Sequence, residues 1–154
     1  MNRLICYVAS GWFTPKQKES YEKIHAALDN FKQHINFIYP KELFEFVPGS
    51  VPTKEQRKEV FEQNLLYIHA SSFVIVNTEE KDIGTLFEAG YAYGFNKKIV
   101  YVCLSLGDEN FNLMLAESAF RICTKIEHLE EIIKRIVLYG IKSIKPFSGN
   151  IKIE

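Results

Sequence analysis

An excess of charge is absent from this chain of 154 residues. Its 19 lysines and arginines balance 19 aspartates and glutamates, so the formal net charge at pH 7 is zero. A neutral protein has no general electrostatic field that gathers phosphate backbones or anionic lipids. We therefore expect no nucleic-acid polymer and no membrane as a partner.

Long hydrophobic runs are absent as well. The N-terminal apolar run 4–9 is too short for the core of a signal peptide or for a membrane span. We interpret it as a buried strand and expect a cytoplasmic protein.

Metal-ligand spacing is also missing. The cysteines are odd in number and lack metal-type spacing, which is typical of small buried side chains in a reducing compartment: Cys6, Cys103 and Cys123. No histidine is spaced with a second histidine or a cysteine as a metal pair: His25, His34, His69 and His128. The sequence therefore predicts no metal site.

Three common loop motifs do not occur. There is no G-x-x-x-x-G-K-[ST], the letters "SGW" after the first apolar run are not G-x-G-x-x-G, and no G-x-S-x-G is present. These absences argue against a nucleotide-phosphate loop and against serine-hydrolase chemistry.

The chain does contain apolar runs that alternate with helical patterns. Apolar runs rich in β-branched and aromatic residues predict strands at 4–10, 35–40, 72–78 and 98–104. Helical patterns occupy 15–31, 53–70, 84–96 and 127–140. Prolines and a glycine predict a surface loop over 41–52, and the tail after 140 has no clear pattern.

Two helix starts carry strong local signals. Thr14 followed by Pro15 is a good N-cap and first-turn pair. Thr53 with Gln56 three residues later is capping-box chemistry. We therefore expect helices to begin directly after both threonines.

The order of these elements is typical of an α/β sandwich with a mostly parallel sheet. We expect a single domain over residues 1–154, with a central sheet flanked by helices in a flavodoxin-like or Rossmann-like arrangement. Such sheets bind ligands outside the C-terminal ends of their strands. The segments 10–13, 77–84 and 105–112 each follow a strand, so we expect them to meet at one edge of the sheet.

Two acids, Asp82 and Glu88, lie six residues apart in "KDIGTLFEAG". A carboxylate near a helix N-terminus is stabilised as the anion, so we expect a lowered pKa for Glu88 and an ionised side chain at neutral pH. An ionised carboxylate can be a nucleophile, yet acids near helix starts are also common for stability alone. This stretch alone leaves both interpretations open.

The surroundings of Glu88 favour a pocket. Apolar and small residues flank it in "FEAGYAYG", whereas an exposed helical acid usually has polar neighbours. We expect this helix to pack closely, with Gly90 allowing a neighbouring backbone to approach. A carboxylate in a core is costly without partners, so a pocket is the better place for Glu88.

Four separated motifs extend this reading over most of the chain, from about Ile5 to Ser118: "YVASGWFTPKQ", "NLLYIHASSFVIVN", "DIGTLFEAGYAYGFNKKIV" and "FNLML". In this order they resemble the first strand and loop, the helix and central strand, the nucleophile segment and the late Asn-Leu-Met motif of the nucleoside 2-deoxyribosyltransferase family.

The resemblance implies exchange of the base on a 2'-deoxynucleoside, with a free nucleobase as second substrate and no metal or organic cofactor. Glu88 would attack the anomeric carbon and form a covalent deoxyribosyl-enzyme. This is the logic of a retaining glycosidase, with a new base instead of water as the final acceptor.

The same resemblance suggests roles for residues near Glu88. Tyr7 matches a tyrosine whose hydroxyl holds the nucleophile, and Phe13 matches an aromatic residue beside the base. Gly11 and Trp12, in the same loop, are expected to contact substrate. Asp82 matches an acid that protonates the departing base, a role that needs a raised pKa.

Asn112 matches a residue that reaches the sugar 5'-hydroxyl from a neighbouring subunit. The resemblance therefore implies a homo-oligomer built from dimers, with a hexamer as one candidate form, and an active site shared between subunits. Asn64 departs from the pattern, because the family often has an aspartate there that is directed at the base. Asparagine keeps the hydrogen bonds but cannot deliver a proton as an acid.

Two other functions stay open at this point. One is an N-glycoside hydrolase acting on deoxynucleosides or deoxynucleotides, whose 5'-monophosphate-specific members resemble this chain but have serines where it has Asp82 and Asn112. Asp82 would repel a 5'-phosphate, which favours a nucleoside. The other is a non-catalytic nucleoside-binding protein. The loop 43–51 is expected to shape the choice of base, without indicating purine or pyrimidine.

Overall fold

The computed structural model describes residues 3–44, 49–145 and 151–154. Within these ranges one five-stranded sheet has the order β2-β1-β3-β4-β5, and every neighbouring pair is parallel. The strands are β1 (Leu4–Ala9), β2 (Ile35–Ile38), β3 (Phe73–Asn77), β4 (Lys98–Val102) and β5 (Arg121–Cys123). The predicted α/β sandwich with a parallel central sheet is confirmed.

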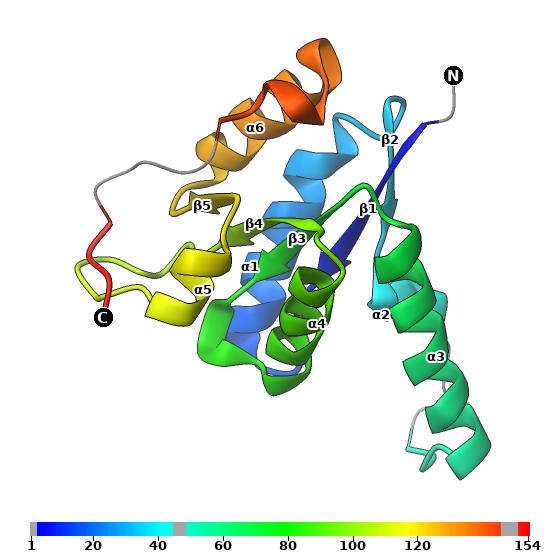
Figure 1. Ribbon diagram of the computed structural model, residues 1–154. Coiled ribbons are helices and arrows are strands. Elements are labelled where there is room, and N and C mark those ends of the chain that lie inside the picture. The colour runs from blue at the N-terminus through cyan, green and yellow to red at the C-terminus, as the bar shows by residue number, and fades with distance from the viewer. Residues whose placement is uncertain (1–2, 45–48, 146–150) are drawn as a thin grey trace.

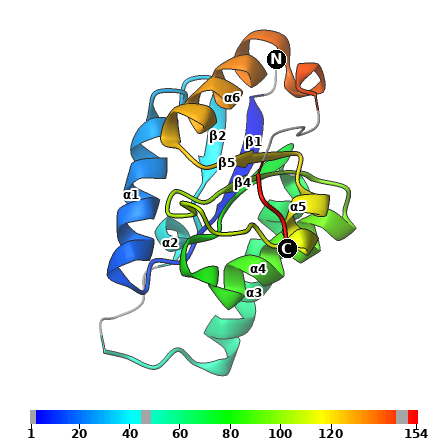
Figure 2. The ribbon, with the colours of Figure 1, turned by 90° about the vertical axis from the view of Figure 1, so that its left-hand side faces the viewer.

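Helices cover both faces of the sheet (Figure 1). They are α1 (Pro15–Asp29), α2 (Pro40–Leu43), α3 (Lys54–Ala70), α4 (Ile83–Gly94), α5 (Leu113–Ser118) and α6 (Ile126–Tyr139), with short 3-10 turns at Glu79–Lys81 and Ile141–Ser143. Helices α1 and α6 pack on one face, whereas α3 and α4 pack on the other (Figure 2).

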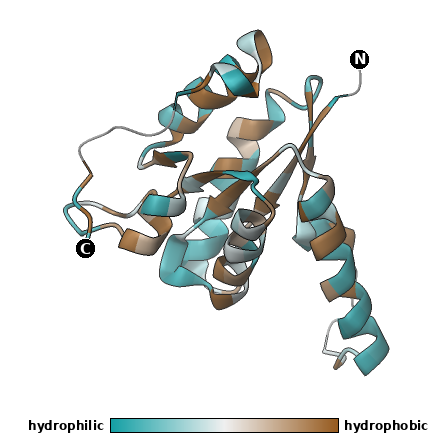
Figure 3. Ribbon diagram, viewed as in Figure 1, coloured by the Kyte–Doolittle hydropathy of each residue, from teal (hydrophilic) through white to brown (hydrophobic). Residues whose placement is uncertain are grey.

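Alternation along the strands divides the core into two layers, because successive side chains of a strand point to opposite faces. Phe73 and Ile75 of β3 pack with the apolar residues of α1 and α6. Val74 and Val76 pack with Ile68 of α3 and with the alanines of α4. The strands are accordingly the most hydrophobic part of the fold, whereas the outer end of α3 is hydrophilic (Figure 3).

Both predicted helix starts are confirmed. The Thr14 side chain accepts a hydrogen bond from the Gln17 backbone, and the Gln17 side chain bonds back, so a complete capping box begins α1. Thr53 and Gln56 form the same arrangement at the start of α3.

Three elements differ from the expectation. The predicted loop from residue 41 begins with α2, because Pro40 stands at the first helical position, where a fixed φ favours a helix turn. The short elements α5 and β5 were not predicted. Strand β5 has three residues and begins with an arginine, so it lacks the length of an apolar run that indicates a strand.

The loops after β1, β3 and β4 meet at the C-terminal edge of the sheet, as expected. Asn77 donates a hydrogen bond to Ser10 at 2.9 Å, which joins the first two loops. Ser105 donates to Glu79 at 2.5 Å, which joins the last two. None of the helices in the described ranges is long and apolar enough to cross a membrane.

Candidate active site

Glu88 and Tyr7 form the centre of the candidate site. Tyr7 lies in β1 with no exposed surface, and its hydroxyl donates a hydrogen bond to Oε1 of Glu88 at 2.7 Å. Helix α4 brings Glu88 to this position because its buried face carries the small residues Ala89 and Ala92, which pack on the sheet. The carboxylate of Glu88, which the sequence predicted to lie in a pocket, therefore has one fixed hydrogen-bond donor.

The electrostatics of Glu88 differ from the expectation. Burial raises the pKa of Glu88 to about 7, the Tyr7 hydrogen bond lowers this pKa, and the charge of Asp82 raises it. The predicted lowering by the helix N-terminus is therefore wrong. Glu88 stands six residues into a helix that begins at Ile83, and the effect of the helix dipole falls off within the first turn.

Tyr7 is a permanent donor in this pair. Burial, followed by the neighbouring charge of Glu88 and the hydrogen bond to it, raises the pKa of the Tyr7 hydroxyl far above its usual range. The hydroxyl keeps its proton at all physiological pH values, so the proton that titrates near neutrality belongs to Glu88.

Asp82 caps helix α4 and lies against the first loop, residues 10–13, which follows β1. Its carboxylate accepts a hydrogen bond from the Thr85 backbone at 2.8 Å. A Cβ atom added to Gly11 would lie 3.0 Å from the Cβ of Asp82 and 2.8 Å from the carboxamide of Gln17. Gly11 is therefore the glycine that permits a close approach here, whereas Gly90, expected to do so, faces open space.

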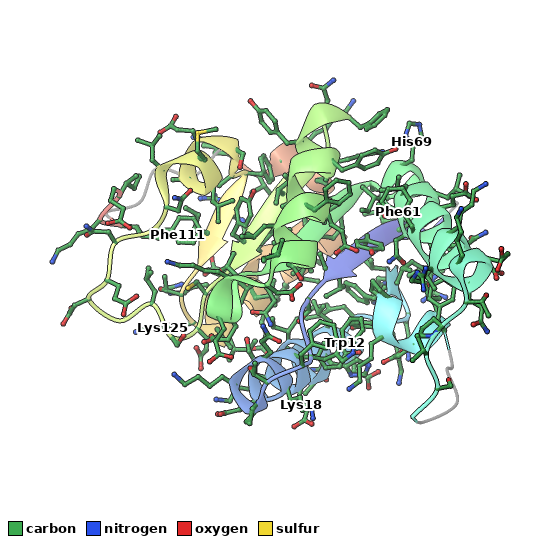
Figure 4. The ribbon with its side chains drawn as sticks, turned by 90° about the horizontal axis from the view of Figure 1, so that it is seen from below. Trp12, Lys18, Phe61, His69, Phe111 and Lys125 are labelled. Carbon is green, nitrogen blue, oxygen red and sulfur yellow. The ribbon has the colours of Figure 1, made fainter. Side chains whose placement is uncertain are left out.

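The first loop places two aromatic rings near this edge. The ring centroids of Trp12 and Phe13 are 5.2 Å apart, and Phe13 is 68% exposed. Oε1 of Gln17 accepts hydrogen bonds from the backbones of Phe13 and Thr14, at 3.0 and 3.3 Å. Figure 4 shows Trp12 close to α1, on the side of the molecule away from Phe111.

Asn64 lies on α3, and the enclosed oxygen of its carboxamide has no hydrogen-bond partner among the described residues. An enclosed acceptor without a donor typically costs about 1–3 kcal/mol. The loop that was expected to shape base preference, 43–51, falls partly outside the described residues, at 45–48.

Asn112 belongs to a different part of the edge. Its side chain caps α5 by accepting hydrogen bonds from the backbones of Met114 and Leu115. It lines a cavity of about 490 Å³ beside the loops after β3 and β4, and this cavity is not lined by Tyr7, Asp82 or Glu88. Among the described residues, no hydrogen bond joins Asn112 to Tyr7, Asp82 or Glu88.

Two buried polar residues at this edge were not singled out from the sequence. Gln17 supports the loop of Trp12 and Phe13, and Asn77 bonds to Ser10, Ser20 and the Glu79 backbone. For Asn77 the one local signal in the sequence is an asparagine at the end of an otherwise apolar strand. No group of three or more potential metal ligands occurs in the described parts of the chain.

Comparison with known proteins adds evidence at the level of the whole chain. A family model described as nucleoside 2-deoxyribosyltransferase matches residues 6–117. Among curated proteins, none matches the chain.

Solved structures are similar over nearly their full length. A 2-deoxyribosyltransferase from Bacillus psychrosaccharolyticus has a TM-score of 0.72 and 25% identity, covering 94% of this chain and 99% of that one. A conserved protein from Enterococcus faecalis V583 has a TM-score of 0.69 and 16% identity, covering 87% and 99%. A 2-desoxiribosyltransferase from Leishmania mexicana has a TM-score of 0.57 and 18% identity, covering 85% and 97%. The last two show a shared fold.

Proposed function

Because the chain belongs to the nucleoside 2-deoxyribosyltransferase family, we propose that it transfers 2-deoxyribose between the nucleobases of 2'-deoxynucleosides. The observation that carries this proposal is the partly buried carboxylate of Glu88, held by the Tyr7 hydroxyl at the edge of the sheet where ligands bind. The family match and the structural similarity support the activity, and the roles of individual residues are part of the proposal.

The first step uses Glu88 in its ionised form. One carboxylate oxygen attacks the anomeric carbon, the bond from this carbon to the base nitrogen breaks, and its electron pair leaves with the base. Tyr7 holds Oε1 and so limits rotation of the carboxylate, which keeps the attacking oxygen in line with the bond that breaks. A covalent deoxyribosyl ester on Glu88 results.

Asp82 supplies the proton that the departing base needs. It lies next to Gly11 in the first loop, and its charge contributes to the raised pKa of Glu88, so the two carboxyl groups share one electrostatic environment. As the general acid, Asp82 passes this proton to the base nitrogen while the bond from the base to the sugar breaks. Asn64 can hold the base by hydrogen bonds but cannot share this acid role.

The second step reverses the first with a different base. A ring nitrogen of the incoming nucleobase attacks the anomeric carbon, the ester bond breaks, and Glu88 returns as a carboxylate. The proton released by the new base returns to Asp82. Each cycle therefore regenerates both acids without any cofactor.

A nucleoside suits the site better than a nucleotide. Asp82 and Asn112 stand where the resembling 5'-monophosphate hydrolases have serines, and a carboxylate repels a 5'-phosphate in a partly dry site. The proposed substrates are a 2'-deoxynucleoside and a free nucleobase. A cytoplasmic location remains a prediction.

The active site is proposed to be shared between subunits of a homo-oligomer built from dimers. Asn112 is exposed, and neither Tyr7 nor Glu88 lines the cavity that it borders, which supports a contact with a sugar bound in a neighbouring subunit. Exposed apolar side chains on α3 and α4, among them Phe61 and Phe87 with ring centroids 6.0 Å apart, offer surface for such contacts.

Hydrolysis of the nucleoside is the second candidate. The exposure of Phe13 leaves the base side of the site open to water in the single chain. Water that reaches the deoxyribosyl ester would release free deoxyribose, because the choice between base and water depends on how well the pocket excludes solvent.

One assay separates these functions. The protein is incubated with deoxyadenosine and free cytosine, and the products are followed by chromatography. Formation of deoxycytidine supports transfer, whereas free deoxyribose that forms regardless of the acceptor supports hydrolysis. Tight binding of the nucleoside without turnover would leave only a binding function.

Variants of Glu88 test the mechanism. Glu88→Ala removes the nucleophile, so both transfer and hydrolysis should fall to background. Glu22→Gln, an exposed change on α1, is the control and should leave turnover unchanged. Retained turnover in Glu88→Ala would refute the role of Glu88.

A further inference from the structure

We propose that Asn77 and Ser10 form a positioning pair that sets the place of the first loop, 10–13, relative to Asp82. This inference rests on the proposed deoxyribosyl transfer and adds residues that touch neither sugar nor base. The pair acts on catalysis through the geometry of the loop, not through contact with substrate.

Asn77 is a buried residue at the end of β3 whose side chain makes several hydrogen bonds, and 1% of its surface is exposed. Its amide nitrogen donates to the Ser10 hydroxyl at 2.9 Å. Its oxygen accepts from the Ser20 hydroxyl at 3.0 Å and from the Glu79 backbone at 3.2 Å. One side chain therefore joins the loop after β1, the helix α1 and the turn that leads to Asp82.

Ser10 connects Asn77 to the first loop by two hydrogen bonds. Its hydroxyl accepts from Asn77 and donates to the carbonyl of Gly11 at 2.9 Å. Gly11 in turn lies close to Asp82, because a Cβ added to Gly11 would lie 3.0 Å from the Cβ of Asp82. Two hydrogen bonds thus lead from Asn77 through Ser10 to Gly11, and Gly11 lies beside Asp82.

A second connection joins the same two loops farther out. The Thr14 hydroxyl donates a hydrogen bond to the carboxylate of Glu80, in the turn between β3 and α4. The two connections lie on either side of Trp12 and Phe13. The loop with the aromatic rings is therefore held at both ends against the segment that carries Asp82.

The place of these bonds explains why they bear on function. Strands β1 and β3 are joined by a parallel ladder from Cys6 to Ala9, and this ladder ends before Ser10. Beyond it the loops have no regular backbone pairing, so side chains decide their relative position. A displacement of about 1 Å at a reacting centre can lower a rate roughly a hundredfold.

Ser10 and Ser20 provide a matched pair of test variants. Each is 4% exposed, and each hydroxyl bonds to one end of the Asn77 amide. Ser10→Ala breaks the link to the first loop, whereas Ser20→Ala breaks only the link to α1. The removed atom and the burial are the same, so differences in activity report on the loop.

The measurement is steady-state base exchange, with kcat and KM determined separately, together with the ratio of free deoxyribose to new deoxynucleoside. For Ser10→Ala we expect kcat to fall about tenfold to a hundredfold and hydrolysis to rise relative to transfer, because a displaced loop admits water. For Ser20→Ala we expect kcat and the product ratio of the wild type. Equal kcat and equal product ratios in the two variants would overturn the proposal.

Asn77→Asp is the second test, and it replaces the first if Ser10→Ala does not fold. Aspartate keeps the oxygen that accepts from Ser20 and Glu79 but cannot donate to Ser10. The single hydroxyl hydrogen of Ser10 can then bond either to this carboxylate or to the Gly11 carbonyl but not to both, so the connection from residue 77 to Gly11 is broken. It should reproduce the loss of kcat and the shift toward hydrolysis. A wild-type product ratio in a folded Asn77→Asp protein would contradict the positioning role.

Failure of this inference can be told apart from failure of the proposed function. If the wild type neither transfers nor hydrolyses, the proposed function is wrong. If the wild type transfers and Ser10→Ala matches Ser20→Ala, only the positioning pair is wrong.

Discussion

Replacing Tyr7 with phenylalanine removes a single hydroxyl from the candidate site and keeps the buried ring. The hydroxyl donates to Oε1 of Glu88 at 2.7 Å, and this bond lowers the pKa of Glu88. Without it, burial and the charge of Asp82 act unopposed and raise the pKa further. In the proposed mechanism Glu88 must be ionised to attack, so the variant should need a higher pH for activity.

The size of this change follows from the hydrogen bond. A hydrogen bond to a charged group typically contributes about 1.5–3 kcal/mol, and a change of one pKa unit corresponds to about 1.36 kcal/mol. Partial contact of Glu88 with solvent favours the lower end of this range. We therefore expect the acid limb to move upward by about one pH unit, from a starting pKa of about 7.

The assay is the pH dependence of kcat/KM for base exchange, because this ratio reports the ionisations of the free enzyme. In the wild type the acid limb should have its midpoint where Glu88 titrates, at a pKa of about 7. In Tyr7→Phe the ionised fraction at pH 7 falls from about one half to about one tenth, so the rate should fall about fivefold from ionisation alone.

Tyr101 supplies the matched control. It is a buried tyrosine in β4 whose hydroxyl bonds to Ser118 at 2.8 Å and not to Glu88. Tyr101→Phe should keep the acid limb of the wild type. An unchanged limb in Tyr7→Phe, or an equal shift in both variants, would refute the coupling between Tyr7 and Glu88.

Three further predictions concern stability and assembly. The pKa of Glu88 is raised from 4.5 to about 7, so between these pH values the folded state binds a proton that the unfolded state releases. The resulting contribution to the free energy of unfolding is fully present below pH 4.5. It should be lost as the pH rises through 7, a fall of up to about 3 kcal/mol. Glu88→Gln should remove most of this fall, as measured by urea unfolding at pH 5 and pH 8, and an identical pH dependence in both proteins would contradict the cause. Gly11→Ala should lower the free energy of unfolding by about 1–3 kcal/mol, because the new methyl group displaces the Gln17 carboxamide, and an unchanged Tm would count against this close approach. If Asn112 serves a neighbouring subunit, mixing inactive Glu88→Ala and Asn112→Ala chains should restore roughly a quarter of wild-type activity in a dimer, whereas no recovery would place both residues in one chain.

Local patterns along the chain were sufficient to predict much of the fold. Thr14 and Thr53 begin helices in the structure as their capping signals indicated. The alternation of apolar runs and helical segments predicted a parallel sheet and therefore the edge at which the loops meet. These features depend on neighbouring residues, so periodicity and capping chemistry reveal them.

Short elements and close backbone contacts were harder to predict from the sequence. Strand β5 forms because residues 121–123 pair with Val100 to Val102, not because its own sequence is strongly β-forming. Gly90 was expected to allow a close approach, yet Gly11 does so. A glycine alone does not show which atoms will lie beside it.

The sequence by itself determined the order of the elements, the starts of the main helices and the presence of Asp82 and Glu88 in one helix-start segment, because these follow from local patterns. Only the tertiary structure decided the state of Glu88. Its hydrogen-bond partner, Tyr7, lies 81 residues away in the chain, and its pKa is raised because burial outweighs the Tyr7 hydrogen bond. Burial depends on which distant segments fold together, and no local pattern reports it.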